Sequence, residues 1–454
     1  MRARHILATA AAGIFAIGLG HQTGHAADLG GDCCADLEER VAELEATTVR
    51  KGNSKISLKV SGWISQQIMW WDDGAVSDTY ILDVGSTLAS YTAFTGSAKI
   101  NEDWSAGFNL HLEWFSSQSL AVDQNNDVAG QGGDPLLIYW WLKNERLGSL
   151  SVGTVSQASD NAGILPADVS GSNLIPANWV IFDGPAFLVR PKGGPAAVDT
   201  SGLAGATWGQ FAFCHHIGAG IGADCNGVPE HAVKWESPSL AGLPISASWG
   251  SGNSFWDVAG RYSRTWGDLN FASAVAFSHR DEDLAGDDVD SDYLQLSAGV
   301  KHVPTGLFIY GAYGLEQNDT VFAADFTGRT TLPDGEHFYI KGGIQKKWLQ
   351  LGATTIWGEY GEHDDQALAG FSDVAIGDSL EAALGAAFAD STITASTFTR
   401  WGFGIQQDID AAAMSFYVKY RRHELDVDFA NAAGAIVQDF EDFDTVIAGG
   451  IVNF

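Results

Sequence analysis

Basic residues are scarce in this chain, in which 25 lysines and arginines stand against 56 aspartates and glutamates. The formal net charge is therefore −31. Such an excess of negative charge argues against nucleic acid as a partner, because phosphate groups would be repelled. It is compatible with polyvalent cations, a cell surface, or a cavity that attracts cations.

Long hydrophobic runs are absent after the N-terminus, so the sequence predicts no transmembrane helix there. The start combines basic "MRARH", apolar "ILATAAAGIFAIGLG" and "GHA", which ends in small residues. This pattern predicts an export signal over residues 1–26, cleaved after Ala26. A retained hydrophobic helix is the alternative, although the apolar run is shorter than the ~20 residues that span a bilayer. We therefore expect a chain in the periplasm, the outer membrane or outside.

Proline and cysteine are also rare, with 11 and 4 copies, whereas glycine has 54 copies and tryptophan 16. Together with little helical periodicity, this composition favours an all-β chain. Alternation with a period of two supports that interpretation. In "ISLKVSGWISQQIMWW" (56–71), apolar Val60, Ile64 and Ile68 alternate with polar residues, and "WSAGFNLHLEW" (104–114) and "MSFYVKYR" (414–421) repeat the pattern.

A soluble sandwich would bury such apolar faces against a second sheet, whereas a transmembrane barrel turns them toward lipid and its polar faces toward a water-filled lumen. The tryptophans near strand ends suit the girdles at the membrane interfaces; they are Trp70, Trp71, Trp104, Trp140, Trp141, Trp348 and Trp401. The final run, "AGGIVNF", ends in Phe454, as outer-membrane barrel strands usually do. We therefore predict a transmembrane antiparallel up-and-down β-barrel.

The length sets the size of this barrel. At roughly 25 residues per strand with its connection, the 55–454 segment gives about 16 strands, with 18 possible, and encloses an aqueous channel. Short turns at 101–103, 266–268 and 304–306 alternate with long polar stretches. We expect long loops at 281–292, 317–335, 361–395 and 425–442.

Several segments closely resemble the alphaproteobacterial porin family of the Rhizobiales type. They are "DCCADLEERVAELEATTVRKGNSKISLKVSGWISQQIMWWDDG", "SVGTVSQASDNAG", "GPAFLVRPKGG", "WGQFAFCHHIGAGIGADCNGVPEHAVKWESP" and the ending "VNF". The resemblance covers essentially the whole chain after the signal. It implies a 16-stranded, homotrimeric general porin among outer-membrane lipid and lipopolysaccharide. Such a porin passes small hydrophilic solutes passively, with no cofactor and no catalysis.

Residues 27–54 are expected to form a periplasmic segment with a short helix over 35–49. Leu37, Val41 and Leu44 occupy heptad core positions, which predicts a coiled-coil stalk in the trimer. Two heptads are marginal alone, and a lone helix packed on its own domain is the alternative. A free amine at Ala27 could attach this segment to peptidoglycan.

In porins of this class the third long loop folds into the lumen, and here it should run from about residue 156 to 185. It carries Asp160, Asp168 and Asp183, which we expect to face a basic wall and to create a transverse field. The alternative is that these aspartates are ordinary turn residues. The basic wall residues are expected to be Lys59, Lys341, Lys419 and Arg421, together with Arg190 and Arg400.

Cysteine pairing is the other expectation for the loops. Cys214 and Cys225 suit a disulfide in an exported protein; a metal site with His215 and His216 is the less favoured alternative, and no metal is expected. For the adjacent Cys33 and Cys34, interchain bridging and a neighbouring-residue disulfide both stay open. The acidic 281–292 stretch is expected to be a solvated loop or to bridge lipopolysaccharide phosphates through Mg²⁺ or Ca²⁺.

Two other functional classes remain in view. A barrel enzyme such as a lipase or protease would need a placed nucleophile and base, but the sequence has no Gly-x-Ser-x-Gly element, and we predict that it is not an enzyme. A structural barrel that anchors the outer membrane to peptidoglycan could coexist with transport.

Overall fold

Alternating strands dominate the structure, a computed structural model that describes residues 55–163, 169, 183–192, 206–214, 220–221, 227–239, 242–251, 255–284, 287–319, 328–369 and 391–454. The first strands are β1 (Ser57–Asp72), β2 (Ser77–Leu82), β3 (Ser90–Lys99), β4 (Trp104–Phe115), β5 (Gly132–Asn144), β6 (Gly148–Val155), β9 (Glu230–Glu236) and β10 (Ile245–Gly250). The remaining strands of the same sheet are β11 (Phe255–Trp266), β12 (Leu269–Leu284), β13 (Asp287–His302), β14 (Leu307–Asn318), β15 (Gly335–Leu349), β16 (Gly352–Asp364), β17 (Thr392–Ile409), β18 (Met414–Asn431), β19 (Gly434–Val437) and β20 (Phe443–Asn453).

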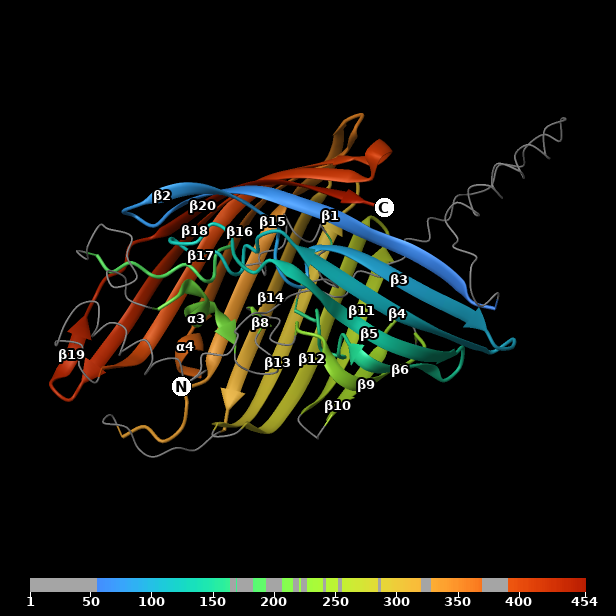
Figure 1. Ribbon diagram of the computed structural model, residues 1–454, viewed down its shortest axis with the longest axis horizontal. Coiled ribbons are helices and arrows are strands. Elements are labelled where there is room, and N and C mark those ends of the chain that lie inside the picture. Colours follow the sequence, from blue (N-terminus) through green and yellow to red (C-terminus); the bar gives the residue numbers. More distant parts are fainter. Residues whose placement is uncertain are drawn as a thin grey trace.

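These strands close into a ring. The sheet has 18 strands, and β2 and β19 pair only with β1 and β18 among the described strands, which leaves 16 in the barrel wall. The ring closes where β1 pairs antiparallel with β20, from Trp63↔Asn453 to Asp72↔Asp444. Figure 1 shows the tilted strands and the barrel that they enclose. The predicted all-β, antiparallel fold with about 16 strands is confirmed.

The two faces of the wall differ as the alternation predicts. Ile64 and Ile68 are each 52% exposed on the outer face of β1, whereas Ser65 and Gln67 between them are buried inside. A closed barrel leaves no unpaired strand edge in hydrocarbon, and an apolar outer band is what lipid requires. The chain is therefore a transmembrane barrel of the outer-membrane type. Over the described ranges, no helix is long and apolar enough to cross a membrane.

The prediction of a tryptophan girdle on the outer face holds for only some of its residues. Trp70 and Trp140 are exposed on the outside, but Trp71 is buried and Trp141 follows the lumen-facing register of β5. Neighbouring residues in a strand point to opposite faces, so two adjacent tryptophans cannot both face lipid. The prediction was wrong for Trp71 and Trp141.

Short turns occur where the sequence predicts them, but two of the predicted long loops need correction. Short turns join β3 to β4, β11 to β12 and β13 to β14. The 281–292 stretch is not a long loop, because β12 and β13 continue their pairing through Asp281↔Asp290 to Leu284↔Asp287. Likewise β18 extends to Asn431, so the loop expected from residue 425 begins later.

Part of the barrel interior is packed rather than open. Two short helices, α3 (Trp208–Ala212) and α4 (Gln366–Ala369), lie within the ring in Figure 1, beside the small sheet of β7 (Phe213–Cys214) and β8 (Gly220–Ile221). A 3-10 turn, η4 (Asp410–Ala412), joins β17 to β18. Phe187 packs between Trp71 and Phe443, with ring centroids 5.0 and 4.8 Å away. The lumen is therefore narrowed by chain segments that pack on its wall.

Several predictions lie outside the described residues. They are the signal at 1–26, the 27–54 segment with Leu37, Val41 and Leu44, the Cys33 and Cys34 pair, and Asp168. The Cys225 position and the side chain of Cys214 are also outside them, so the disulfide stays a prediction.

Candidate functional site

The chain enters the lumen directly after β6 and is fixed there by lumen-facing side chains from successive strands. Ser248 on β10 accepts a hydrogen bond from the Ala158 amide at 2.6 Å, and Asp257 on β11 accepts one from the Ser159 amide at 2.8 Å. Ser297 on β13 donates to the Ala162 carbonyl at 2.5 Å. The 156–163 segment therefore follows the inner wall strand by strand.

Asp160 lies on this segment and is 2% exposed. Arg261 on β11 donates to the Asp160 carbonyl oxygen at 2.7 Å. Burial raises the pKa of its carboxyl to about 7, against the opposing effects of Ser156, Lys234 and Arg261. Asp160 thus faces bases of β9 and β11 rather than those of β18, a pairing that we did not predict.

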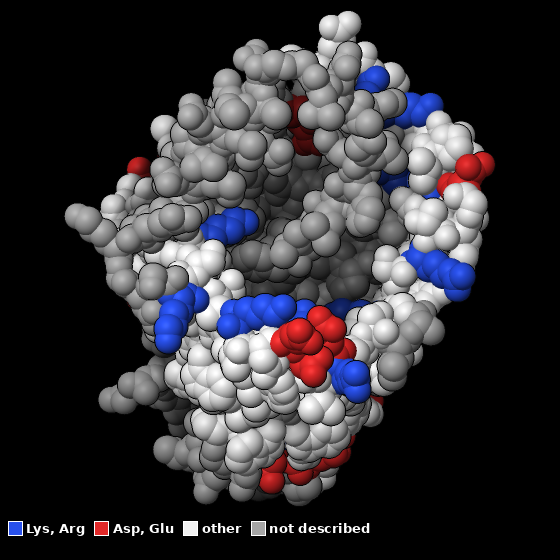
Figure 2. Space-filling model, turned by 90° about the vertical axis from the view of Figure 1, so that its right-hand side faces the viewer, with Lys and Arg blue, Asp and Glu red and all other residues white. Residues whose placement is uncertain are grey.

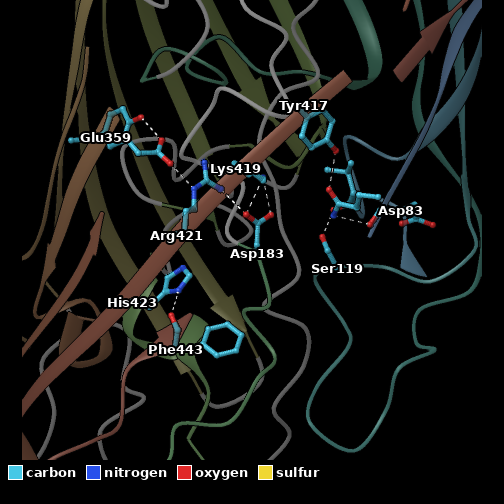
Figure 3. Close-up of polar contacts among 12 residues, drawn as sticks. Asp83, Ser119, Asp183, Glu359, Tyr417, Lys419, Arg421, His423 and Phe443 are labelled. Atoms are coloured by element: carbon cyan, nitrogen blue, oxygen red, sulfur yellow. Dashed lines mark hydrogen bonds and ion pairs between the residues drawn. The ribbon is translucent and has the colours of Figure 1, made fainter. Parts of the chain in front are cut away.

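Asp183 lies on the opposite side of the lumen, against β18. Its Oδ2 is 2.9 Å from Nζ of Lys419 and 2.7 Å from an Nη of Arg421, and all three side chains are buried. Burial opposes ionisation of Asp183, but the two cations outweigh it, so the pKa of this carboxyl lies below its ordinary value. Figure 3 shows Asp183 reaching up to Lys419 and Arg421 on one strand. The structure thus brings together three residues that the sequence singled out.

A second acid completes this cluster. Glu359 on β16 accepts a bond from Nε of Arg421 at 2.6 Å and another from the Tyr339 hydroxyl on β15 at 2.8 Å. Gly402 on β17 gives the arginine its room, since a Cβ there would lie 2.3 Å from the Tyr420 carbonyl and 2.9 Å from Cγ of Arg421. Arg421 is therefore held between two carboxylates, one on the wall and one on the loop.

The other predicted bases divide into two groups. Lys341 on β15 and Arg400 on β17 are buried on the inner wall, and Lys341 is in register with Glu359. With Lys419 and Arg421 they make four cations against two carboxylates, Asp183 and Glu359, a formal excess of two positive charges. This excess favours anions at this point of the lumen.

Arg190 and Lys59 are placed differently. Arg190 is not on a strand; it follows Asp183 in the inner segment and pairs with Asp73 at 2.7 Å, so its assignment to the wall was wrong. Lys59 faces inward on β1, in register with Thr95. Met69 on β1 pairs with Ile447 on β20, and Ile447 pairs with Lys419 on β18, so Met69 marks the level of Lys419. Lys59 is ten positions from Met69, which is about 33 Å along the strand. Lys59 therefore lines a different level of the lumen.

Sequence reasoning missed Glu359, Tyr339, Asp257 and Arg261. Each sits at an inward position of an alternating strand, so the period of two could have placed them on the lumen face. What the period could not show is which of them the loop would contact. Within the described part of the chain, no group of three or more His, Cys, Asp or Glu residues is arranged to hold a metal ion.

Comparison with known proteins gives matches in structure rather than sequence. No protein-family model matches the sequence, and no curated protein matches it. The anion-selective porin from Comamonas acidovorans has a TM-score of 0.51 and 12% identity, covering 88% of this chain and 100% of that one. OmpT, an outer membrane protein of Vibrio cholerae, has a TM-score of 0.49 and 11% identity, covering 89% and 99%. Salmonella typhi OmpF in complex with daunomycin has a TM-score of 0.47 and 13% identity, also covering 89% and 99%. The likeness to the Comamonas protein shows that this chain has the fold of an outer-membrane porin.

Proposed function

We propose that this chain is a general porin of the alphaproteobacterial, Rhizobiales type, a water-filled channel for passive diffusion of ions and small hydrophilic solutes. One observation carries the proposal: a closed ring of 16 strands has a charged inner face, to which an entering loop is fixed through Asp183, Lys419 and Arg421. Chain segments that pack on two sides of a wide lumen narrow it without closing it. The function is transport without catalysis or a cofactor.

The mechanism follows from the placement of charge. Bases on β15, β17 and β18 line one side, while acids of the entering loop lie against the wall. Ions in a narrow aqueous gap interact more strongly with fixed charges than ions in bulk water, because low-dielectric walls focus the field. Solutes would be sorted by size at the loop and by charge at the wall.

Liposome swelling tests this function. Vesicles that contain the purified protein should swell in solutions of small sugars, at rates that fall steeply with solute size. Empty vesicles and vesicles with heat-denatured protein are the controls. If swelling in the smallest sugars stays at the rate of empty vesicles, the chain is not a general porin.

We propose further that the protein is a homotrimer. The outer wall of β18, β20 and β1 carries a groove of about 520 Å³, lined by exposed Ile68 and Phe416 and by small Ala448. Gln66 also lines it, and an amide that lacks hydrogen-bond partners is costly in hydrocarbon. A second copy of the chain would cover this face and shield the Gln66 amide.

Assembly is tested by native migration before and after heating. We expect a trimer that dissociates on boiling, and weaker association when Ala448→Trp fills the groove. Ile309→Trp, on the outer face of β14, is the matched control. A monomeric wild-type barrel would contradict the trimer.

A further inference from the structure

A cavity of about 490 Å³ lies on the inner wall between β4, β5, β6 and β9, away from the Asp183 cluster. Its lining combines an aromatic pair, Tyr139 and Trp141, with Asn109, Ser151, Lys143 and Lys234. A second cavity of about 450 Å³ adjoins it toward the short turns and shares Trp141 and Lys143. The two cavities form one track along the wall.

The strand register explains why lysines gather here. Lys99 on β3 pairs with Ser105 on β4, Ser105 pairs with Lys143 on β5, and Lys143 pairs with Ser149 on β6. Adjacent strands are about 4.8 Å apart, so the backbones of Lys99 and Lys143 are about 10 Å apart. Both side chains are exposed to the lumen. Figure 2 shows lysines and arginines around the hollow at this end of the barrel.

The aromatic pair forms a fixed platform. A Cβ at Gly107 would lie 2.3 Å from Cζ2 of Trp141, so the indole covers the glycine backbone of β4. Trp141 stays half-exposed to the cavity. Beside it, Nδ2 of Asn109 donates to the Tyr139 hydroxyl at 3.3 Å. A flat apolar surface is thus bordered by amide and hydroxyl groups.

We propose that this track is a binding site for monosaccharide-sized anions such as sugar phosphates and sugar acids. The ammonium groups of Lys99 and Lys143 would hold the anionic group, and the apolar face of the sugar ring would stack on Trp141. Serine hydroxyls from β4 and β6 would meet the sugar hydroxyls. This inference rests on the proposed porin function and names a substrate class for it.

Acids also line the track. Glu236 lines the first cavity and lies two strands from Lys143, with Ser149 between them in the register. Glu102, Asp103 and Glu145 lie at the turns and line the second cavity together with Lys99 and Lys143. The anionic group is therefore placed between the two lysines, over Ser105 and on the side of Lys143 away from Glu236. The turn carboxylates would slow entry of anions, whereas the two lysines act directly on a bound one. Lys234 is set apart, because its Nζ donates to the Ser156 carbonyl at 3.0 Å and holds the inner loop.

The test is single-channel recording with added solutes. Glucose 6-phosphate should interrupt the current through wild-type channels at lower concentration than glucose or inorganic phosphate. Glucose lacks the phosphate group that the lysines bind, and inorganic phosphate lacks the sugar ring that stacks on Trp141. Lys99→Gln with Lys143→Gln should weaken the block by glucose 6-phosphate about ten-fold. Trp141→Ala should weaken it about five-fold and leave any block by inorganic phosphate unchanged.

Lys347→Gln is the control, because Lys347 is an exposed lysine at the same end of the barrel on β15 whose charge is paired with Asp410 at 2.7 Å. It should leave the block unchanged. Open channels that glucose 6-phosphate interrupts no better than glucose would overturn the anion site and leave the porin function standing. Equal block by inorganic phosphate and glucose 6-phosphate would overturn the role of the Trp141 platform. Protein that opens no channel would contradict the porin function itself.

Discussion

Replacing Asp183 with asparagine removes the loop carboxylate that lies between Lys419 and Arg421 while keeping side-chain volume and hydrogen-bonding reach. At bulk-water dielectric, a unit charge and an ion about 6 Å apart interact by about 0.7 kcal/mol, and screening at 0.1 M salt lowers this to about 0.4 kcal/mol. Loss of the Asp183 charge stabilises an anion in the lumen and destabilises a cation there by this amount each. The difference between the two free energies therefore changes by about 0.8 kcal/mol. The anion-to-cation permeability ratio should therefore rise about four-fold.

Reversal potentials under a salt gradient measure this ratio directly. The shift should shrink in 1 M salt, where the Debye length falls to ~3 Å. Asp290→Asn is the matched control, because Asp290 is an exposed aspartate at the far end of β13. A larger shift for Asp290→Asn than for Asp183→Asn would refute the reasoning, and would place selectivity in the charge outside the lumen.

Two further predictions concern the inner loop and the wall. Because the folded pKa of Asp160 is about 7 and its ordinary value is 3.8, the stability that this group adds is full at low pH and declines as the pH rises through about 7. The thermal unfolding midpoint should fall between about pH 5 and pH 8 more in the wild type than in Asp160→Asn, and equal slopes would contradict the buried carboxyl. Gly402→Ala should destabilise the barrel by about 1–3 kcal/mol, since its Cβ would clash with the Tyr420 carbonyl of β18. Denaturant unfolding measures this loss, and Gly260→Ala, where a Cβ would meet no atom closer than 3.8 Å, tests whether loss of glycine alone explains it.

Much of the fold could be predicted because alternation is a local signal. Each strand shows its lipid face and its lumen face in sequence, as Ile64 and Ser65 do, and the count of runs gives the barrel size. Adjacent tryptophans were misplaced because aromatic content was used without the period of two. The 281–292 stretch was misread because acidic residues suggested a loop, whereas backbone pairing continues through them.

The site was harder to predict because its contacts join residues far apart in the chain. Asp183 and Arg421 are 238 positions apart, and nothing local marks them as partners. Asp160 and Arg190 show the same difficulty. Asp160 lies beside Lys234 and Arg261 rather than the β18 bases, and Arg261 bonds its backbone carbonyl. Arg190 pairs with Asp73 rather than with an aspartate of the predicted loop. Only the path of the loop inside the barrel decides such pairings.

Conductance of the purified protein in a planar bilayer tests the central claim most directly. A water-filled lumen predicts stable, ohmic steps whose size rises in proportion to salt concentration. A folded, β-rich protein that inserts into the bilayer and passes no current would contradict the channel.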